Sequence, residues 1–227
     1  MIGVFDSGKG GLFTVREIRR LSETADVCFL ADTENAPYGT KSKEELIPLV
    51  SRDIERLRER GASPILMACC TASTVYPYLS ERERESAIPI IEPTARAALG
   101  LSPKRIGVIA TERTVRTRAF SRELFGLGFS GEVFEVQTQP LVSMIEGGTR
   151  DGNITEGERK RISDILSPMR DFRPDALILG CTHFSYIERE ISALLFSVPT
   201  VSSAREGALE VLRRAPQLCG KGRTVYL

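Results

Sequence analysis

The stretch that decides the fold is Ile65–Ser73, which reads ILMACCTAS. A short apolar run comes first, and two cysteines and small hydroxyl residues follow it. An apolar run of this length is typical of a strand that is buried on both faces of a parallel sheet. Hydroxyl residues directly after such a run are typical of a helix start. The stretch therefore predicts a buried strand that ends at a thiol, Cys69, close to a helix N-terminus.

The same arrangement occurs a second time at Leu177–Thr182, which reads LILGCT. Cys181 follows this apolar run as Cys69 follows the first. Two other runs also resemble each other, Ile2–Ser7 (IGVFDS) and Ile106–Thr111 (IGVIAT). Buried strands look alike in many α/β proteins, but cysteines at matching places favour a duplication. We therefore expect two related halves.

Apolar runs and helix-start patterns alternate along the rest of the chain. The predicted strands are Ile2–Phe5, Val27–Leu30, Ile65–Ala68, Ile106–Ala110, Val133–Val136 and Leu177–Leu179. A Ser or Thr followed three residues later by Glu predicts a helix start, and this pattern begins at Ser42, Thr155, Ser185 and Ser203. Gly61 is predicted to end the first of these helices, and the apolar face after Thr155 predicts one helix that reaches Phe172. Such alternation predicts an α/β fold with largely parallel sheets.

Composition excludes several classes of function. The chain has 227 residues, with 31 Lys and Arg against 30 Asp and Glu, so its formal net charge is +1. This balance gives no reason to expect binding to nucleic acid or to an anionic membrane. No apolar run approaches the roughly 18 residues that a membrane-spanning helix needs. The first residues, Met1–Asp6, lack the basic and apolar regions of a signal peptide, so we expect a cytoplasmic protein.

The five cysteines stand at positions 28, 69, 70, 181 and 219. Their odd number and the expected cytoplasmic location indicate reduced thiols. The cysteines form no C-x-x-C pair and His183 is the only histidine, so the sequence predicts no metal site. A buried cysteine most often acts as a small apolar side chain, and this is our interpretation of Cys28 and Cys219.

Cys69 and Cys181 need a different interpretation, because carboxyl ends of strands in open parallel sheets are where ligands bind. A following helix N-terminus favours a thiolate, and the small residues Ala68 and Gly180 leave room for a ligand. Two thiols from facing halves can flank one carbon, so that one removes a proton and the other delivers a proton to the opposite face. Such an inversion needs no cofactor. The glycine-rich Gly8–Gly11 matches no complete nucleotide-binding motif and is interpreted as a turn whose N–H groups approach a carboxylate.

Further blocks extend this pattern over most of the chain. They are Ile2–Gly8 with Gly10–Gly11, Asp32–Thr33 with Pro37–Ser42, Ala68–Cys69 with Thr71–Ser73, Ile106–Thr111 with Thr114–Val115, and Leu179–His183. Together they resemble the glutamate racemases, a cofactor-independent family within the aspartate/glutamate racemase superfamily. The resemblance implies two pseudo-symmetric α/β domains with the active site in the cleft between them. The first domain is expected to span residues 1–93, completed by 201–227, and the second to span 94–200.

The resemblance also implies roles for individual residues. Cys69 and Cys181 are the implied proton carriers, and Asp6 is implied to support Cys69. His183 and Glu146 are implied to support Cys181. The residues implied to hold the substrate are Asp6, Ser7, Tyr38, Gly39, Cys70, Thr71, Thr182 and His183. The product, D-glutamate, is a building block of bacterial peptidoglycan and so of the cell wall that sets cell shape. Family members vary in how they dimerise, so a homodimer is a further expectation.

The sequence departs from the family pattern at two places. Cys70 stands where the family has Asn, and a thiol is a much weaker hydrogen-bond donor than an amide. Val201–Ala204 lacks the Asp that the family has before its Ser. Two alternatives therefore stay open: a racemase of aspartate or another acidic amino acid, and a catalytically weak member that acts by binding a partner. Thr111 and Thr114 stay open as either helix caps or ligand contacts.

Overall fold

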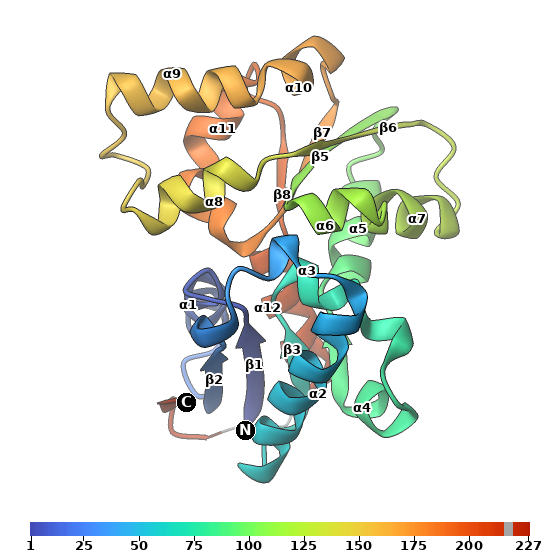
Figure 1. The fold of residues 1–227 in the computed structure, drawn as a ribbon, viewed down its shortest axis with the longest axis vertical. Coiled ribbons are helices and arrows are strands. Elements are labelled where there is room, and N and C mark those ends of the chain that lie inside the picture. Colours follow the sequence, from blue (N-terminus) through green and yellow to red (C-terminus); the bar gives the residue numbers. More distant parts are fainter. Residues whose placement is uncertain (216–219) are drawn as a thin grey trace.

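The chain folds into two α/β domains, each built on its own parallel sheet, and the domains lie one above the other in Figure 1. The computed structural model describes residues 1–215 and 220–227, and Cys219 lies outside these ranges. Both chain ends lie in the lower domain of the figure. The expected fold class, two related α/β domains with parallel sheets, is confirmed.

The strands of the first sheet are β1 (Ile2–Asp6), β2 (Val27–Ala31), β3 (Ile65–Met67), β4 (Ala87–Pro89) and β9 (Thr224–Tyr226). They lie in the order β4-β3-β1-β2-β9, and every pair is parallel. The strands of the second sheet are β5 (Arg105–Ala110), β6 (Glu132–Gln137), β7 (Ala176–Gly180) and β8 (Thr200–Ser202). They lie in the order β6-β5-β7-β8 and are also parallel.

The two sheets share one strand order. The run β4-β3-β1-β2 of the first sheet corresponds to β8-β7-β5-β6 of the second, and the strands also follow one another in the same sequence along the chain. The similar runs seen in the sequence occupy equivalent places, because β1 matches β5 and β3 matches β7. Cys69 and Cys181 therefore follow corresponding strands, as expected of two related halves.

The α-helices are α1 (Gly11–Leu21), α2 (Lys43–Glu59), α3 (Cys70–Ser73), α4 (Glu81–Ser86), α5 (Ile91–Leu99), α6 (Glu112–Arg116), α7 (Ala119–Gly126), α8 (Gln139–Glu146), α9 (Glu156–Ile165), α10 (Ser167–Phe172), α11 (Glu188–Leu194) and α12 (Ser203–Arg214). Short 3₁₀ helices are η1 (Thr33–Asn35), η2 (Tyr38–Thr40), η3 (Tyr76–Tyr78) and η4 (Thr182–Ile187). Gly61 follows α2 with a φ of +71°, which confirms it as the predicted end of that helix. Within the described ranges, every helix falls short of the length and apolar character that a membrane crossing requires.

Two of the predicted helix starts are confirmed as capping boxes. Ser42 and Thr155 each accept the backbone N–H of the glutamate three residues on, and that glutamate accepts the backbone N–H of its cap residue. The prediction at Ser185 was wrong, because this residue lies within η4 and its hydroxyl pairs with that of Ser202 at 2.7 Å. Ser202, rather than Ser203, caps α12 by accepting a backbone N–H.

The helix predicted to continue from Thr155 to Phe172 is divided in two. α9 ends at Ile165 and α10 begins at Ser167. Pro168 explains the division, because it has no backbone N–H to donate and its ring clashes with the preceding turn of a continuous helix. The apolar face was read correctly, but the proline signal was missed.

The strands lie where the sequence predicted them, but one interpretation was wrong. β6 is an edge strand that is only partly covered, and Phe134 keeps 37% of its surface exposed. A strand buried on both faces was expected there. β4, β8 and β9 were not predicted, because none of these three-residue strands is a continuous run of large apolar residues like β3 (Ile65–Met67).

One apolar cluster joins the two domains. It includes Ile2 and Val4 of β1, Ile106 and Val108 of β5, and buried side chains of α5 and α12. Two further clusters cover the outer faces, one between the first sheet and α2 and the other between the second sheet and α8 to α11. Cys28 is fully buried in the α2 cluster, which confirms its interpretation as a small apolar side chain.

The end of the chain returns to the first domain, where β9 pairs with β2. Asp26 holds the segment before β9, since its carboxylate accepts the backbone N–H groups of Lys221 at 3.0 Å and Arg223 at 2.8 Å. β8 lies across the expected boundary at residue 200 and pairs within the second sheet. The domain boundaries themselves stay a prediction.

Gly180, the last residue of β7, stands where there is no room for a side chain. A Cβ at this position would lie 2.8 Å from Cε2 of Phe120 and 2.9 Å from the carbonyl oxygen of Ile109. The sequence assigned the small residue to ligand access. Close packing between β7, β5 and α7 is a second reason for it.

We expect Gly180→Ala to destabilise the fold by about 1–3 kcal/mol, because the added methyl group must displace a packed ring or the neighbouring strand. A lower midpoint of urea unfolding with an unchanged slope measures the loss. Gly126→Ala is the control, since nothing lies within 4 Å of the added Cβ, and its midpoint should stay the same or rise. Equal midpoints for the two variants would contradict the packing argument.

Candidate active site

Cys69 lies just beyond β3 and is the N-cap residue of α3. Its sulfur accepts the N–H of Ala72 at 3.5 Å and lies 3.4 Å from the hydroxyl of Ser7. Ser7 follows β1, the strand beside β3, so two neighbouring strand ends hold this thiol. The thiol thus lies at a strand end and a helix N-terminus, where the sequence predicted it.

Cys181 comes directly after β7 and precedes η4, a 3₁₀ helix. Its sulfur lies 3.6 Å from Nδ1 of His183. The other ring nitrogen, Nε2, lies 3.2 Å from Oε1 of Glu146 at the end of α8. This contact lowers the pKa of Glu146 below its usual value. Cys181, His183 and Glu146 therefore form a chain of contacts on the second domain's side of the site.

Both cysteines line one small cavity between the domains. Predicted site residues that also line it are Ser7, Tyr38, Gly39, Cys70, Thr71, Glu146, Thr182 and His183. The cavity has a volume of about 30 Å³, which is space for a few water molecules at most. A ligand the size of an amino acid therefore enters only when the domains or the lining side chains move apart.

The cavity has further lining residues that the sequence had not assigned to a site. They are Ala36, Pro37, Gln139 and Val142, together with Thr111, which had been left open, and Gly180, which had been read as making room for a ligand. Gln139, Val142 and Glu146 all belong to α8 and stand three and four residues apart, so they share one face of that helix. Helical spacing counted back from Glu146 was the signal that could have found the other two.

Asp6 lies behind the cavity wall, unlike the other predicted residues, and is almost completely buried. Its carboxylate accepts the N–H of Gly8 at 2.9 Å and, across the domain interface, the hydroxyl of Thr182 at 3.1 Å. Burial raises the pKa of Asp6, and His183 opposes the shift. The glycine-rich turn thus serves a carboxylate of the chain itself. Gly10 in that turn allows the close approach of the second domain, since a Cβ there would lie 2.6 Å from Nδ1 of His183.

Burial dominates the ionisation of the thiols. It raises the pKa of Cys69 to about 11, and the carboxylate of Asp6 adds to this shift while the hydroxyl of Ser7 opposes it. Burial also raises the pKa of Cys181 and of Cys70. The thiols are therefore protonated at neutral pH in the closed cavity, and a thiolate needs a positive charge beside it.

Comparison with known proteins places these features in a family. The family model of the Asp/Glu/Hydantoin racemases matches residues 14–211. The chain belongs to this family. A glutamate racemase of Desulforudis audaxviator is 37% identical over 220 residues, which are 94% of this chain and 80% of that protein. A glutamate racemase of Aquifex aeolicus is 36% identical over 211 residues, which are 91% of this chain and 80% of that protein.

Solved structures of racemases have the same fold as this member of the family. Glutamate racemase isoform RacE1 from Bacillus anthracis superposes with a TM-score of 0.88 at 30% identity, over 100% of this chain and 86% of that one. The glutamate racemase from Francisella tularensis in complex with D-glutamate gives a TM-score of 0.86 at 27% identity, over 99% of this chain and 86% of that one.

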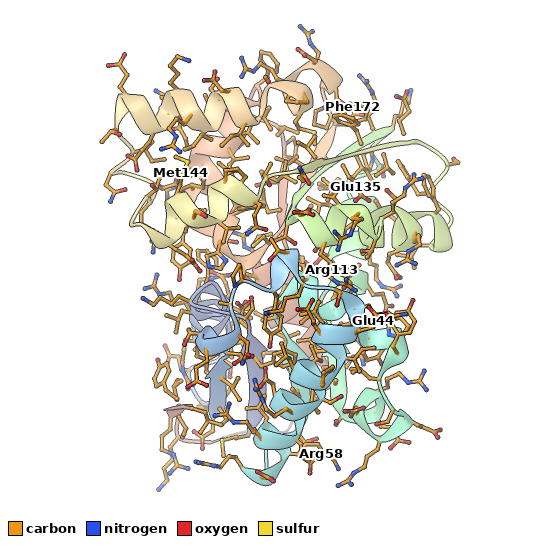
Figure 2. The ribbon with its side chains drawn as sticks, viewed as in Figure 1. Glu44, Arg58, Arg113, Glu135, Met144 and Phe172 are labelled. Carbon is orange, nitrogen blue, oxygen red and sulfur yellow. The ribbon has the colours of Figure 1, made fainter. Side chains whose placement is uncertain are left out.

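Hydroxyl and guanidinium groups connect the two racemase domains around the cavity. Thr71 and Thr111 share a hydrogen bond of 2.8 Å, and Thr111 pairs with Thr114 at 2.9 Å. Arg113 lies at the boundary between the domains (Figure 2), where it donates to the hydroxyl of Thr74 at 3.0 Å and to the carbonyl of Lys41 at 3.2 Å. Thr111 precedes α6, but its side chain makes no capping bond. Its hydroxyl bonds across the interface instead.

Tyr38 directs its hydroxyl into a buried polar cluster. The hydroxyl donates to Oδ2 of Asp32 at 2.6 Å and lies 3.1 Å from Oδ2 of Asp53. Arg52 bridges the two carboxylates at 2.8 Å and 2.9 Å. Burial raises the pKa of Asp53, and the hydrogen bond from Arg52 opposes the shift. The cluster anchors η2 and so holds Gly39 in the cavity wall.

A larger surface groove of about 1090 Å³ lies between α1 and the η4–α11 segment, and neither Cys69 nor Cys181 lines it. Within residues 1–215 and 220–227, no group of three or more His, Cys, Asp or Glu side chains is arranged to hold a metal ion. The thiol cavity brings together the side chains of Cys69, Cys181, His183 and Glu146.

We expect Tyr38→Phe to lower the free energy of unfolding by about 1–3 kcal/mol, because two buried carboxylates lose a hydrogen-bonding neighbour. Urea unfolding gives the change in stability. Tyr78→Phe serves as control, since Tyr78 is 54% exposed, and should change stability by less than about 0.5 kcal/mol. A Tyr38 variant as stable as the control would show that the cluster does not anchor η2.

Proposed function

We propose that the chain interconverts L- and D-glutamate, with Cys69 and Cys181 as the two proton carriers. The single observation that supports this most is the placement of two thiols, from corresponding strand ends of two different domains, in the wall of one cavity. A carbon between them can lose a proton on one side and gain one on the other. Membership of the racemase family and the names of the relatives support glutamate as the substrate.

The proposed reaction balances without a cofactor. One thiolate takes the α-proton, so an S–H bond forms, the Cα–H bond breaks and the electron pair stays on the carbanion. The opposite thiol then gives its proton to the other face of Cα, and the new Cα–H bond has inverted configuration. The two sulfurs have then exchanged their protonation states. The reverse reaction restores them.

The neighbours of each sulfur give the thiols different environments. Ser7 and Asp6 lie on the side of Cys69, while His183, backed by Glu146, can exchange a proton with Cys181. The α-ammonium group of a bound amino acid supplies the positive charge that a thiolate needs. Hydroxyl and backbone N–H groups around the α-carboxylate stabilise the charge that develops there, and closure of the cavity excludes water.

Glutamate as substrate is tested by incubating the reduced protein with L-glutamate in D₂O. We expect deuterium at Cα and loss of the circular dichroism of the amino acid. L-aspartate in parallel tests the first alternative, which Cys70 keeps open: turnover of aspartate without turnover of glutamate would replace the proposal. Absence of exchange with any acidic amino acid would favour a partner-binding role.

The proposed activity also implies where the protein works. Its product, D-glutamate, would feed peptidoglycan synthesis, and its reduced thiols would require the reducing cytoplasm. The homodimer stays a prediction.

We expect Cys69→Ala and Cys181→Ala each to abolish racemisation, because each removes one of two required proton carriers. The rate of optical change of L- and of D-glutamate measures the effect. Cys28→Ala is the matched control, since Cys28 is a buried thiol that does not line the cavity, and it should keep its activity. Retained activity in Cys69→Ala together with an inactive Cys70→Ala would assign the role to the neighbouring thiol.

We expect kcat/KM for glutamate to rise between about pH 6 and about pH 9. The pKa of Cys69 is raised to about 11, so the thiolate fraction in the free enzyme grows about tenfold per pH unit below that value. The other thiol stays protonated over the same range because burial raises its pKa too. Initial rates in buffers of constant ionic strength give the profile. A profile that falls above neutral pH would contradict this order of ionisation.

A further inference from the structure

Helix α8 presents polar side chains to the cavity at both of its ends. Gln139 begins the helix, Glu146 ends it, and both line the cavity with Val142 between them. Eight residues of α-helix span about 10 Å. The helix therefore runs along the cavity wall and offers two separate polar contacts to a bound molecule.

The Glu146 end of α8 lies beside the reacting groups. Glu146 contacts His183, which in turn contacts Cys181. The carbon that reacts must lie near these groups and Cys69. The Gln139 end therefore lies beside the part of a bound amino acid that is remote from Cα.

Gln139 is packed tightly in the domain interface. A Cβ placed on Gly39 would collide with Oε1 of Gln139 and lie 3.1 Å from Cβ of Thr111. The carboxamide of Gln139 thus lies against the 36–40 segment of one domain and near the end of β5 in the other. Its Oε1 is buried and has no hydrogen-bond partner among residues 1–215 and 220–227. A buried polar atom without a partner is unfavourable, so a bound group that pairs with the carboxamide is favoured.

We propose that Gln139 is a specificity-determining residue whose carboxamide binds the distal carboxylate of the substrate. This inference rests on the proposed function, because it assigns the far end of the same substrate. A rotation of the amide by 180° exchanges its oxygen and nitrogen, so the same position offers an N–H to a carboxylate. Glutamate reaches one methylene group farther from Cα than aspartate, and a donor at the far end of α8 favours the longer substrate.

A neutral donor at this place also suits the chemistry. A lysine or arginine there would place a permanent positive charge in the wall of the cavity that Cys69, Cys70 and Cys181 also line, and would favour their thiolates. An amide binds the carboxylate while leaving the thiols to respond to the substrate's ammonium group. Gln139 can therefore bind the distal carboxylate without lowering the pKa of the thiols in the closed site.

The test compares Gln139→Ala and Gln139→Glu with Gln137→Ala and Gln137→Glu. Gln137 is an exposed glutamine at the end of β6, outside the cavity lining. We expect Gln139→Ala to lower kcat/KM for glutamate by roughly 10- to 100-fold, mainly through KM. Gln139→Glu should weaken glutamate further by like-charge repulsion, but should weaken glutamine, used as a competing ligand with a neutral distal group, much less. The Gln137 variants should match the wild type.

Equal losses for glutamate and glutamine in Gln139→Glu would overturn the inference and leave Gln139 a packing residue. Unchanged kinetics in both Gln139 variants would overturn it as well. The proposed function fails separately, if the wild type exchanges no α-proton. In that case the binding of glutamate is measured by calorimetry, which needs no turnover. Tighter binding to the wild type than to Gln139→Ala supports the inferred role of Gln139. Equal binding to both, or no binding to either, overturns the inferred role.

Discussion

The structure depends on one geometric constraint: two sulfur atoms from separate sheets must lie in the wall of the same small space. Parallel sheets meet this constraint because their strands all end at one edge, and two sheets of equal strand order place Cys69 and Cys181 at corresponding edges. Hydrogen bonds across the interface then fix the distance between the edges. Asp6 with Thr182, Thr71 with Thr111, and Arg113 with Thr74 are such contacts.

Closing the site around the thiols has two opposite effects on their chemistry. It removes water, which favours proton transfer to and from carbon, and it raises the pKa of both thiols, which disfavours the thiolate that must start the reaction. In the proposed reaction the charges of the substrate reconcile these effects, since the ammonium group enters only with the ligand. The proposal therefore has the thiols protonated in the resting protein, and one of them becomes a base when the ammonium group arrives.

Much of this arrangement could be predicted from the sequence because it depends on local pattern. Apolar runs followed by Cys and hydroxyl residues gave the strands and the thiol positions, and the boxes at Ser42 and Thr155 gave two helix starts. The same reasoning failed where a distant residue decides the outcome. Ser185 has a capping pattern, yet its hydroxyl pairs with Ser202 of another segment. Pro168 was a local signal that outweighed the apolar face around it.

The residues of the candidate site also divide into those that local sequence predicts and those that distant contacts decide. The family motifs predicted the two thiols and their immediate neighbours, but Asp6 lies behind the cavity wall and does not line the cavity. Gln139 lies outside any quoted motif, and only the packing of α8 against Gly39 and Thr111 brings it to the cavity. The hydroxyl of Tyr38 points to Asp32 and Asp53 for a similar reason, because Asp53 lies on α2, far along the chain.

The apolar cluster shared by the domains determines how they can separate. Within the described ranges, the chain passes from one sheet to the other at α5 and at α12, and both helices contribute to that cluster. Around the cavity, by contrast, the domains meet through hydrogen bonds, which water replaces at little net cost. When the domains separate, the apolar cluster at α5 and α12 therefore acts as the hinge, and the hydrogen-bonded side around the cavity opens. The kind of contact on each side thus sets the direction of the domain motion.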